Sequence, residues 1–166
     1  MSPPIPAIEW FEGSRDELAD LFALADDSPG ALSAYRDLGR VLVARDGPSV
    51  IGHLQLVAGD SAGAAEVKSI AVREDRQGKG VGRMLLERAM AACRDEGRSV
   101  LVVAAAAADV GVLRFYQLLG FRLLRVERDA FTPDAGYPAI EVDGIPLRDR
   151  VWLSLSAGDA EVPGDS

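Results

Sequence analysis

The feature of the sequence that most limits its fold is a glycine-rich stretch between a β-rich run and a long helical pattern. It reads Arg73-Glu-Asp-Arg-Gln-Gly-Lys-Gly-Val-Gly-Arg83. The residues before it alternate as a strand up to Val72, and those after it follow an amphipathic helix to about Glu96. A helix start offers unpaired backbone N–H groups and the positive end of the helix dipole. Glycine lets a ligand approach those groups closely. The stretch therefore predicts a phosphate-binding turn, the alternative being a plain strand-to-helix connector.

Two widespread phosphate motifs do not fit this stretch. The dinucleotide fingerprint G-x-G-x-x-G, counted from Gly78, requires a third glycine where Arg83 stands. The P-loop requires Gly-Lys-Ser/Thr at its end, and the stretch has no such sequence.

A third motif does fit. Gln77-Gly-Lys-Gly-Val-Gly82, directly after the strand Ser69-Ile-Ala-Val72, resembles the Gln/Arg-x-x-Gly-x-Gly/Ala signature of the GNAT family of N-acetyltransferases. About thirty residues on, Arg114-Phe-Tyr-Gln-Leu-Leu-Gly-Phe121 resembles the second signature of that family. The order and spacing of strands agree with the family from about Val41 to Leu155. The resemblance implies an α+β fold, with a mixed, mostly antiparallel central sheet, splayed central strands and flanking helices.

The resemblance also implies acetyl-coenzyme A as co-substrate and gives each matching position a role. Backbone groups of Ile70, Ala71 and Val72 would pair with the pantetheine arm, and the N–H of Val72 would polarise the thioester carbonyl. The pyrophosphate would lie on Gln77, Gly78, Lys79, Gly80, Val81 and Gly82. The cations Arg76, Lys79 and Arg83 would either add charge there or remain solvated at the helix start.

Two residues match catalytic positions of the family. Tyr116 would protonate the departing thiolate; the alternative is a ring packed in the core. Glu66 would act as general base, directly or through water, because an amine with a pKa near 10.4 is mostly protonated at neutral pH. The alternative for Glu66 is a carboxylate paired with a neighbour on the strand.

Two positions depart from the usual pattern. Asp109 stands where the second signature often begins with Asn, and an ionised Asp cannot donate to a pantetheine carbonyl. Asp109 would then contact the cofactor differently or only cap its helix. The side chains of the run Ala104–Ala108 are unusually small, and they would either widen the acceptor pocket or allow a helix to pack closely.

Other chemically distinctive residues have plainer interpretations. His53, the one histidine, lies in an apolar strand and is predicted to be a hydrogen-bonded core residue rather than a base. Cys93, the one cysteine, falls on the buried face of its helix and is predicted to be inert. Asp26 and Asp27 precede a short helix as dipole partners or, alternatively, as substrate ligands. We predict no metal site.

The segment from residue 129 to 149 is long for a bare connector. Asp143-Gly144 between apolar residues predicts a small hairpin, which would form a lid over the acceptor. Asp134, Tyr137 and Glu141 are its candidate acceptor contacts. A homodimer contact is the competing explanation for this segment.

The rest of the chain is consistent with one domain, 1–166, with loose ends at about 1–4 and 157–166. The order of predicted elements is one strand, two helices, three strands, a helix, a strand, a helix and two strands. A single cysteine and the lack of a secretory pattern at the N-terminus favour the cytoplasm. No apolar run is long enough to span a membrane.

The formal net charge of -8 argues against nonspecific nucleic-acid binding. We expect an acetyl-coenzyme A-dependent enzyme that acetylates a small-molecule primary amine. The alternatives are acetylation of a protein N-terminus or lysine, and a non-catalytic acyl-coenzyme A-binding regulatory module.

Overall fold

The computed structural model describes residues 4–157, so the predicted loose ends lie almost wholly outside the described residues. The strands are β1 (Ala7–Trp10), β2 (Arg40–Asp46), β3 (Ser49–Ala58), β4 (Ala64–Val72), β5 (Val100–Ala106), β6 (Arg122–Glu127), β7 (Glu141–Val142), β8 (Ile145–Pro146) and β9 (Arg150–Ser156). The α-helices are α1 (Ala19–Ala25), α2 (Pro29–Tyr35), α3 (Val81–Asp95) and α4 (Val110–Leu118). Short 3-10 helices are η1 (Arg15–Leu18), η2 (Glu74–Arg76) and η3 (Pro133–Ala135).

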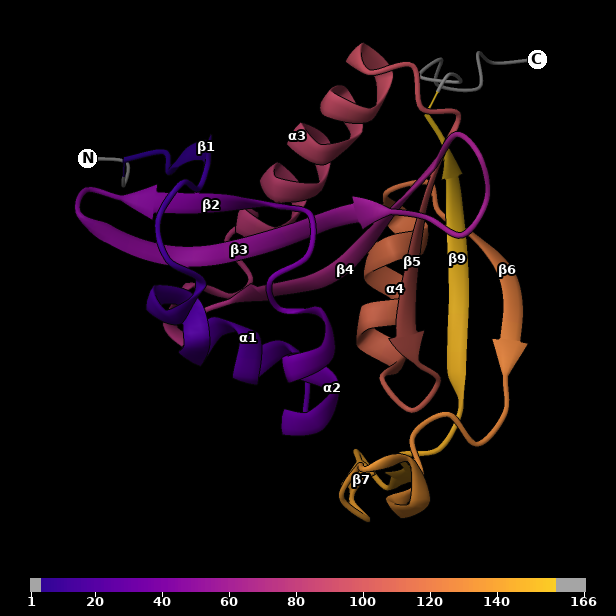
Figure 1. The fold of residues 1–166 in the computed structure, drawn as a ribbon. Coiled ribbons are helices and arrows are strands. Elements are labelled where there is room, and N and C mark those ends of the chain that lie inside the picture. Colours follow the sequence, from indigo (N-terminus) through magenta and orange to yellow (C-terminus); the bar gives the residue numbers. More distant parts are fainter. Residues whose placement is uncertain (1–3, 158–166) are drawn as a thin grey trace.

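Seven strands form one sheet in the order β1-β2-β3-β4-β5-β9-β6 (Figure 1). Every neighbouring pair is antiparallel except β4 and β5, which run parallel. The predicted α+β fold with a mixed, mostly antiparallel sheet is therefore confirmed.

The two parallel strands in the middle of the sheet separate along their length. Their pairing covers only Ala64–Val67 of β4 and Val100–Val103 of β5. Beyond it, β4 continues to Val72 along β3 and β5 continues to Ala106 along β9. The predicted splay of the central strands is thus present, and it divides the sheet into two halves.

A β-bulge interrupts β4 just where the splay begins. Gln55 of β3 lies opposite Ser69, whereas the next residue, Leu56, lies opposite Val67, so Lys68 is the extra residue. The sequence predicts strict alternation, with Val67 and Ser69 on one face. The bulge overturns this prediction, because an extra residue reverses the faces that follow it. Val67 lies in the core under α3, whereas Ala71 lies in the core under α1.

The two faces of the sheet carry different layers. Helices α3 and α4 lie behind the sheet as drawn in Figure 1, and α1 and α2 lie in front of its first half. The core on the α3 and α4 face is continuous across both halves and includes Leu42, Leu54, Leu86, Leu101 and Leu153. The core on the α1 and α2 face draws its residues from η1, α1, α2, β2, β3 and the end of β4.

Near the N-terminus the structure corrects two details. The sequence predicts a capping box that Ser14 forms with Glu17. This prediction is wrong, because the Ser14 hydroxyl accepts from the N–H of Asp16 and starts the 3-10 helix η1. The apolar spacing of this helix also predicts that Leu24 is buried with Leu18 and Leu21, but Leu24 is 43% exposed. The 3-10 turn before α1 rotates the helix relative to a continuous α-helical pattern, and this displaces Leu24 from the core.

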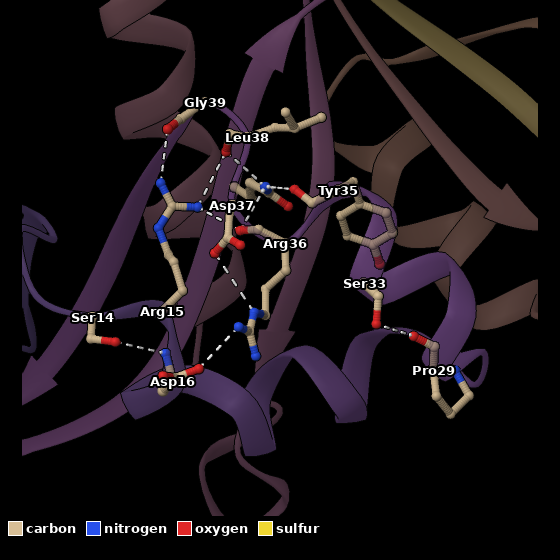
Figure 2. A network of polar contacts seen from close by, with 11 residues as sticks. Ser14, Arg15, Asp16, Pro29, Ser33, Tyr35, Arg36, Asp37, Leu38 and Gly39 are labelled. Atoms are coloured by element: carbon tan, nitrogen blue, oxygen red, sulfur yellow. Dashed lines mark hydrogen bonds and ion pairs between the residues drawn. The ribbon is translucent and has the colours of Figure 1, made fainter.

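Two side chains fix the connection from α2 to β2 (Figure 2). The guanidinium of Arg15 donates to the carbonyl oxygens of Arg36 at 2.7 Å and Gly39 at 2.8 Å. The buried amide of Gln55 donates to the carbonyl oxygens of Tyr35 and Leu38, each at 2.8 Å. These bonds hold the C-terminal end of α2, and with it the Tyr35 ring, against the sheet.

The segment from residue 129 to 149 has a defined structure of its own. The N–H of Phe131 donates to the carbonyl of Arg148 and closes its base. Its tip forms the two-stranded sheet β7-β8, and the turn residues Asp143 and Gly144 have φ of 49° and 86°. The predicted hairpin is confirmed, since positive φ at both central residues is typical of a tight hairpin turn.

Candidate active site

The turn after β4 presents a row of free backbone donors. Within residues 4–157, none of the N–H groups from 78 to 83 has a hydrogen-bond acceptor. Helix α3 begins at Val81, and Gly80 precedes it without a side-chain cap. Six consecutive unpaired amides at the positive end of a helix dipole can bind an anion.

The glycines make this turn possible. Gly78 and Gly80 have φ of 74° and 86°, a region that residues with a Cβ rarely adopt. A Cβ added at either position would have no atom within 4 Å, so the turn is open to a ligand. Gly82 has a different function, because a Cβ there would lie 3.4 Å from the Phe115 ring of α4.

The cations around the turn already have partners in the protein. Arg76 forms an ion pair with Asp46, and Arg83 pairs with Glu87 one helical turn away. Lys79 donates to the carbonyl of Asp75 at 3.2 Å. The side chain of Gln77 donates to the carbonyl of Val72. The backbone amides are therefore the free donors of this turn, and the cations surround it.

The splay leaves one edge of β4 without a partner strand. The N–H of Arg73 donates to Ile51 of β3, so by antiparallel alternation Ala71 also faces β3. Ile70 and Val72 consequently turn their N–H and C=O groups toward the splay. Of the three predicted pantetheine contacts, Ile70 and Val72 are thus placed to pair with a ligand, and Ala71 is not.

Tyr116 lies close to this edge, on α4. Tyr116 is 3% exposed, and its ring packs against the rings of Phe115 and Phe121. Phe115 in turn lies near Gly82 and Val72, which brings α4, the start of α3 and the end of β4 together. Burial, with a smaller effect of Asp109, raises the pKa of the Tyr116 hydroxyl, which therefore remains protonated and able to donate at neutral pH.

Asp109 is the N-cap of α4. Its carboxylate accepts from the N–H of Val112 at 3.1 Å. The capping interpretation therefore accounts for this residue, and a contact with a cofactor would use its remaining oxygen.

Glu66 lies at the start of the splay, and its side chain is 12% exposed. Burial raises the pKa of the carboxyl, while Lys68 and Arg150 lower it to a smaller extent. The ammonium of Lys68 is 3.8 Å from a carboxylate oxygen of Glu66 and 5.2 Å from the centre of the Tyr35 ring. A buried carboxylate with a raised pKa is suited to accept a proton near neutral pH.

The face of the sheet in front of Glu66 is open beyond β4. Among the described residues no helix covers this face of β5, β9 and β6 (Figure 1). Ala104 and Ala106 of β5 lie on it, whereas Ala105 lies in the core. Trp152 and Arg150 of β9 lie on the same face, in register with Ala104 and Ala106. We refer to this surface as the open face.

The segment from residue 129 to 149 and the α1–α2 connection border the open face. Tyr35 donates from its hydroxyl to Asp26 at 2.8 Å. Burial raises the pKa of the Tyr137 hydroxyl, and the nearby Asp26 carboxylate raises it further. Arg150 lowers this pKa to a smaller extent. A Cβ on Gly136 would lie 3.4 Å from the hydroxyl of Ser28. Of the lid residues predicted to contact the acceptor, Tyr137 therefore faces the site, whereas Asp134 and Glu141 are exposed.

Sequence reasoning missed several residues of this surface. No sequence motif marks the positions of Tyr35, Lys68, Arg150 and Trp152. The bulge that turns Lys68 onto the open face also has no signal in the sequence. The sequence signal for this surface is the run of small residues Ala104–Ala108, of which Ala104 and Ala106 line the open face.

His53 and Cys93 are core residues, as predicted. His53 is fully buried, its ring lies 2.8 Å from the Ser69 hydroxyl, and burial lowers its pKa to about 3. Cys93 is on the buried face of α3, and burial raises the pKa of its thiol.

A hollow in the surface lies elsewhere, lined by residues that include Gly39, Leu56, Glu96 and Arg98. It is beyond the C-terminal end of α3, opposite the glycine turn. A second hollow is lined by Val110, Leu113, Arg114, Gln117 and Leu118 of α4. Neither hollow is lined by residues of the glycine turn or of the open face.

Comparison with known proteins gives consistent matches. The model of the acetyltransferase (GNAT) family matches residues 6–121. YvbK of Bacillus subtilis, named as an uncharacterized N-acetyltransferase, is 31% identical over 148 residues, which is 89% of this chain and 94% of that protein. An acetyltransferase of Bacillus subtilis in complex with coenzyme A is 30% identical, with a TM-score of 0.82 over 91% of this chain and 98% of the other. A GNAT family acetyltransferase of Elizabethkingia anophelis with acetyl-coenzyme A bound is 26% identical, with a TM-score of 0.83 over 91% and 97%.

Proposed function

The chain belongs to the GNAT family of acetyltransferases, which use acetyl-coenzyme A, and we propose that it transfers the acetyl group to a primary amine of a small molecule. The observation that carries the proposal is the junction of two features at the end of β4. One is the row of free amides from 78 to 83, and the other is the unpaired edge of the strand.

The residues fit acetyl-coenzyme A. Its pyrophosphate matches the free amides at the start of α3, where positive φ at Gly78 and Gly80 leaves the backbone uncovered. Its pantetheine amides match the N–H and C=O groups of Ile70, as an added strand would, and the N–H of Val72 remains for the thioester carbonyl. The positive charge around the turn comes from Arg76, Lys79 and Arg83, which do not contact the phosphates directly in this proposal.

Acetyl-coenzyme A supplies an acetyl group activated as a thioester. The protein supplies three functions around it. Glu66 accepts the proton of the ammonium substrate, because its raised pKa makes it a stronger base than an exposed glutamate. The N–H of Val72 is a donor for the carbonyl oxygen on which negative charge develops. The Tyr116 hydroxyl donates a proton to the leaving sulfur.

A small acceptor is favoured by the surroundings of Glu66. The α1–α2 connection and the lid approach one another at Ser28 and Gly136, and the aromatic rings of Tyr35, Phe131 and Tyr137 lie nearby. A carboxylate enclosed on this side suits a short amine that enters over the open face.

A panel of amines tests the proposal. Purified protein is mixed with acetyl-coenzyme A and each amine, and release of the free thiol is followed together with the mass of the product. We expect thiol release that requires an amine and gives the acetylated small molecule. A melting temperature that does not change with millimolar acetyl-coenzyme A, combined with no thiol release, contradicts the proposal.

Two alternatives predict other results. A protein acetyltransferase would acetylate peptide N-termini or lysines and leave small amines unchanged. A regulatory module would show the rise in melting temperature with acetyl-coenzyme A but no transfer to any amine. The burial and raised pKa of Glu66 favour transfer over regulation.

A further inference from the structure

Two half-buried cations converge on the open face from different strands. Lys68 stands at the bulge of β4 with its side chain 35% exposed, and Arg150 stands at the start of β9 with its side chain 25% exposed. Both lower the pKa of Glu66, so both lie within electrostatic range of the proposed base. The protein as a whole has a net charge of -8, which makes two cations beside one carboxylate unexpected there.

Aromatic rings hold both cations in place. The Lys68 ammonium is 5.2 Å from the centre of the Tyr35 ring, and the Arg150 guanidinium is 4.7 Å from that of Phe131. Tyr35 is itself fixed by its hydrogen bond to Asp26 and by the bonds of Gln55 to the end of α2. The cations are therefore positioned in advance, with a smaller entropic cost of binding than mobile surface lysines would have.

Both cations also have donors to spare. Among the described residues, Lys68 makes no hydrogen bond, and its nearest carboxylate oxygen is 3.8 Å away. Arg150 uses one terminal nitrogen for Glu127 at 2.9 Å, and its guanidinium also lies close to the hydroxyl of Tyr137. An ammonium has three donors and a guanidinium five, so an acceptor group can be added to each.

The charges around Glu66 leave one positive charge to be compensated when an ammonium substrate binds. Lys68 is balanced by Glu66 and Arg150 by Glu127, so the substrate ammonium adds one positive charge to the site. Transfer of its proton to Glu66 keeps the net charge the same, but leaves Lys68 as the cation without a counter-charge. A single negative charge on the substrate balances the site, whereas a doubly charged phosphate would exceed what is needed.

We propose that the acceptor carries a carboxylate as well as its amine, and that Lys68 and Arg150 bind this carboxylate on the open face. This assignment rests on the proposed function and adds a substrate class to it, that of amino-carboxylic acids. Ala104 and Ala106 leave the floor beside these cations free for the side chain of such a substrate.

Matched pairs of substrates test the assignment. Leucine is compared with isoamylamine, and phenylalanine with phenethylamine, which lack only the carboxylate. For the wild type we expect kcat/KM to be at least about tenfold higher for the carboxylated member of each pair. Lys68→Met and Arg150→Met should each lower that value by about 10- to 100-fold, the range for loss of a charge-assisted contact. Each variant should lower kcat/KM for the simple amine by a clearly smaller factor, so the ratio of the two kcat/KM values within each pair should fall.

Two further variants serve as controls. Lys68→Arg retains the cation and should restore part of the preference for the carboxylated member. Arg94→Gln removes the same charge from the exposed end of α3 and should leave the preference unchanged. Two independent sites, Lys68 and Arg150, keep the test decisive if one methionine variant fails to fold.

The outcomes are distinguishable from failure of the proposed function. Turnover of simple amines with no preference for their carboxylated partners overturns this inference and leaves amine acetylation intact. Equal losses for both members of a pair also overturn it, because they indicate general damage to the site. If no amine is acetylated, a binding measurement still tests the inference. The change in melting temperature that leucine produces is compared with the change that isoamylamine produces, both with coenzyme A present. A larger shift with leucine, abolished in both methionine variants, supports the assignment, and equal shifts overturn it.

Discussion

The side-chain amide of Gln77 donates a hydrogen bond of 2.9 Å to the carbonyl oxygen of Val72. This bond connects the two parts of the proposed cofactor site directly. One end belongs to the turn with the free amides, and the other to the strand edge whose N–H is the proposed donor for the thioester carbonyl. The bond thereby sets the distance between phosphate and thioester positions before a ligand arrives.

Removing this bond should loosen the cofactor site. Gln77→Leu should weaken binding of acetyl-coenzyme A by about fivefold, because one hydrogen bond contributes roughly 1 kcal/mol. Calorimetric titration measures the change. Gln117→Leu is the matched control, since Gln117 makes a similar bond to the carbonyl of Leu113 on the exposed side of α4. Equal affinities for both variants would show that Gln77 does not organise the site.

The free amides of the turn can be tested by adding a negative charge. Gly80→Asp should abolish the rise in melting temperature with acetyl-coenzyme A, because the carboxylate repels the pyrophosphate. Gly97→Asp is the control. Gly97 also has positive φ and open space around a Cβ, but it lies past the other end of α3. Both variants bear a similar backbone strain, so only Gly80→Asp should lose the ligand response.

The proton donor can be removed with little change in packing. Tyr116→Phe should retain cofactor binding and lower kcat by about ten- to a thousandfold, the effect of losing a positioned acid. Stopped-flow measurement of the transfer step checks this expectation. Unchanged kcat, with transfer shown to be rate-limiting, would assign Tyr116 to the core alone.

Glu66 should give the rate a distinctive pH dependence. Glu66→Gln keeps the shape and removes the base, so it should depress the rate most below the pKa of the amine. The deficit should shrink as pH rises and the amine arrives neutral. Transfer rates measured from about pH 6 to 10 span the relevant range for an alkylamine. Parallel profiles for the two proteins would exclude Glu66 as the base while leaving acetyl transfer intact.

The same substitution should also stabilise the folded protein. The pKa of Glu66 is higher in the folded than in the unfolded state, so its ionised form costs stability. That cost is absent below the unfolded pKa of about 4.3 and sets in as pH rises through the folded pKa. Glu66→Gln should therefore melt above the wild type at pH near 7, and the two melting curves should converge near pH 4. A constant difference across this range would contradict the raised pKa.

His53 should make the protein sensitive to acid. Its folded pKa of about 3 lies below the unfolded value, so its stabilising effect is complete above about pH 6.5. That effect declines as pH falls toward 3, by at most roughly 1.4 kcal/mol per pH unit. His53→Gln retains a polar group near Ser69 and has no such titration. Denaturant unfolding of both proteins between about pH 7 and 4 should show a steeper fall for the wild type.

The parts of the fold that could be predicted from sequence are those with local signals. Glycines of positive φ at the turn, the apolar stripe of α3 and the Asp143-Gly144 hairpin each express the backbone or burial requirement of their own segment. A motif of this kind reports the conformation of the chain within a few residues. The cofactor side of the candidate site, which is built from one such segment, could therefore be predicted in some detail.

The open face could not be predicted, because it depends on contacts between distant segments. Lys68 and Arg150 come from β4 and β9 and are brought together by strand pairing through β5. The bulge at Lys68 also breaks the alternation from which the faces of β4 were predicted. No residue near position 68 marks the bulge, since it arises from the register between β3 and β4.

The two cores of the sheet give the two proposed binding sites different mechanical properties. Behind the sheet, apolar packing under α3 and α4 runs without a break from Leu42 to Leu153 and joins the halves. In front, the packing under α1 and α2 stops at β4. Any relative rotation of the halves must therefore pivot about the rear core, which leaves the spacing around Val72 and Gly82 stiff. The same rotation changes the width of the open face, so the acceptor side is compliant and can adjust to substrates of different size while the cofactor side retains its shape.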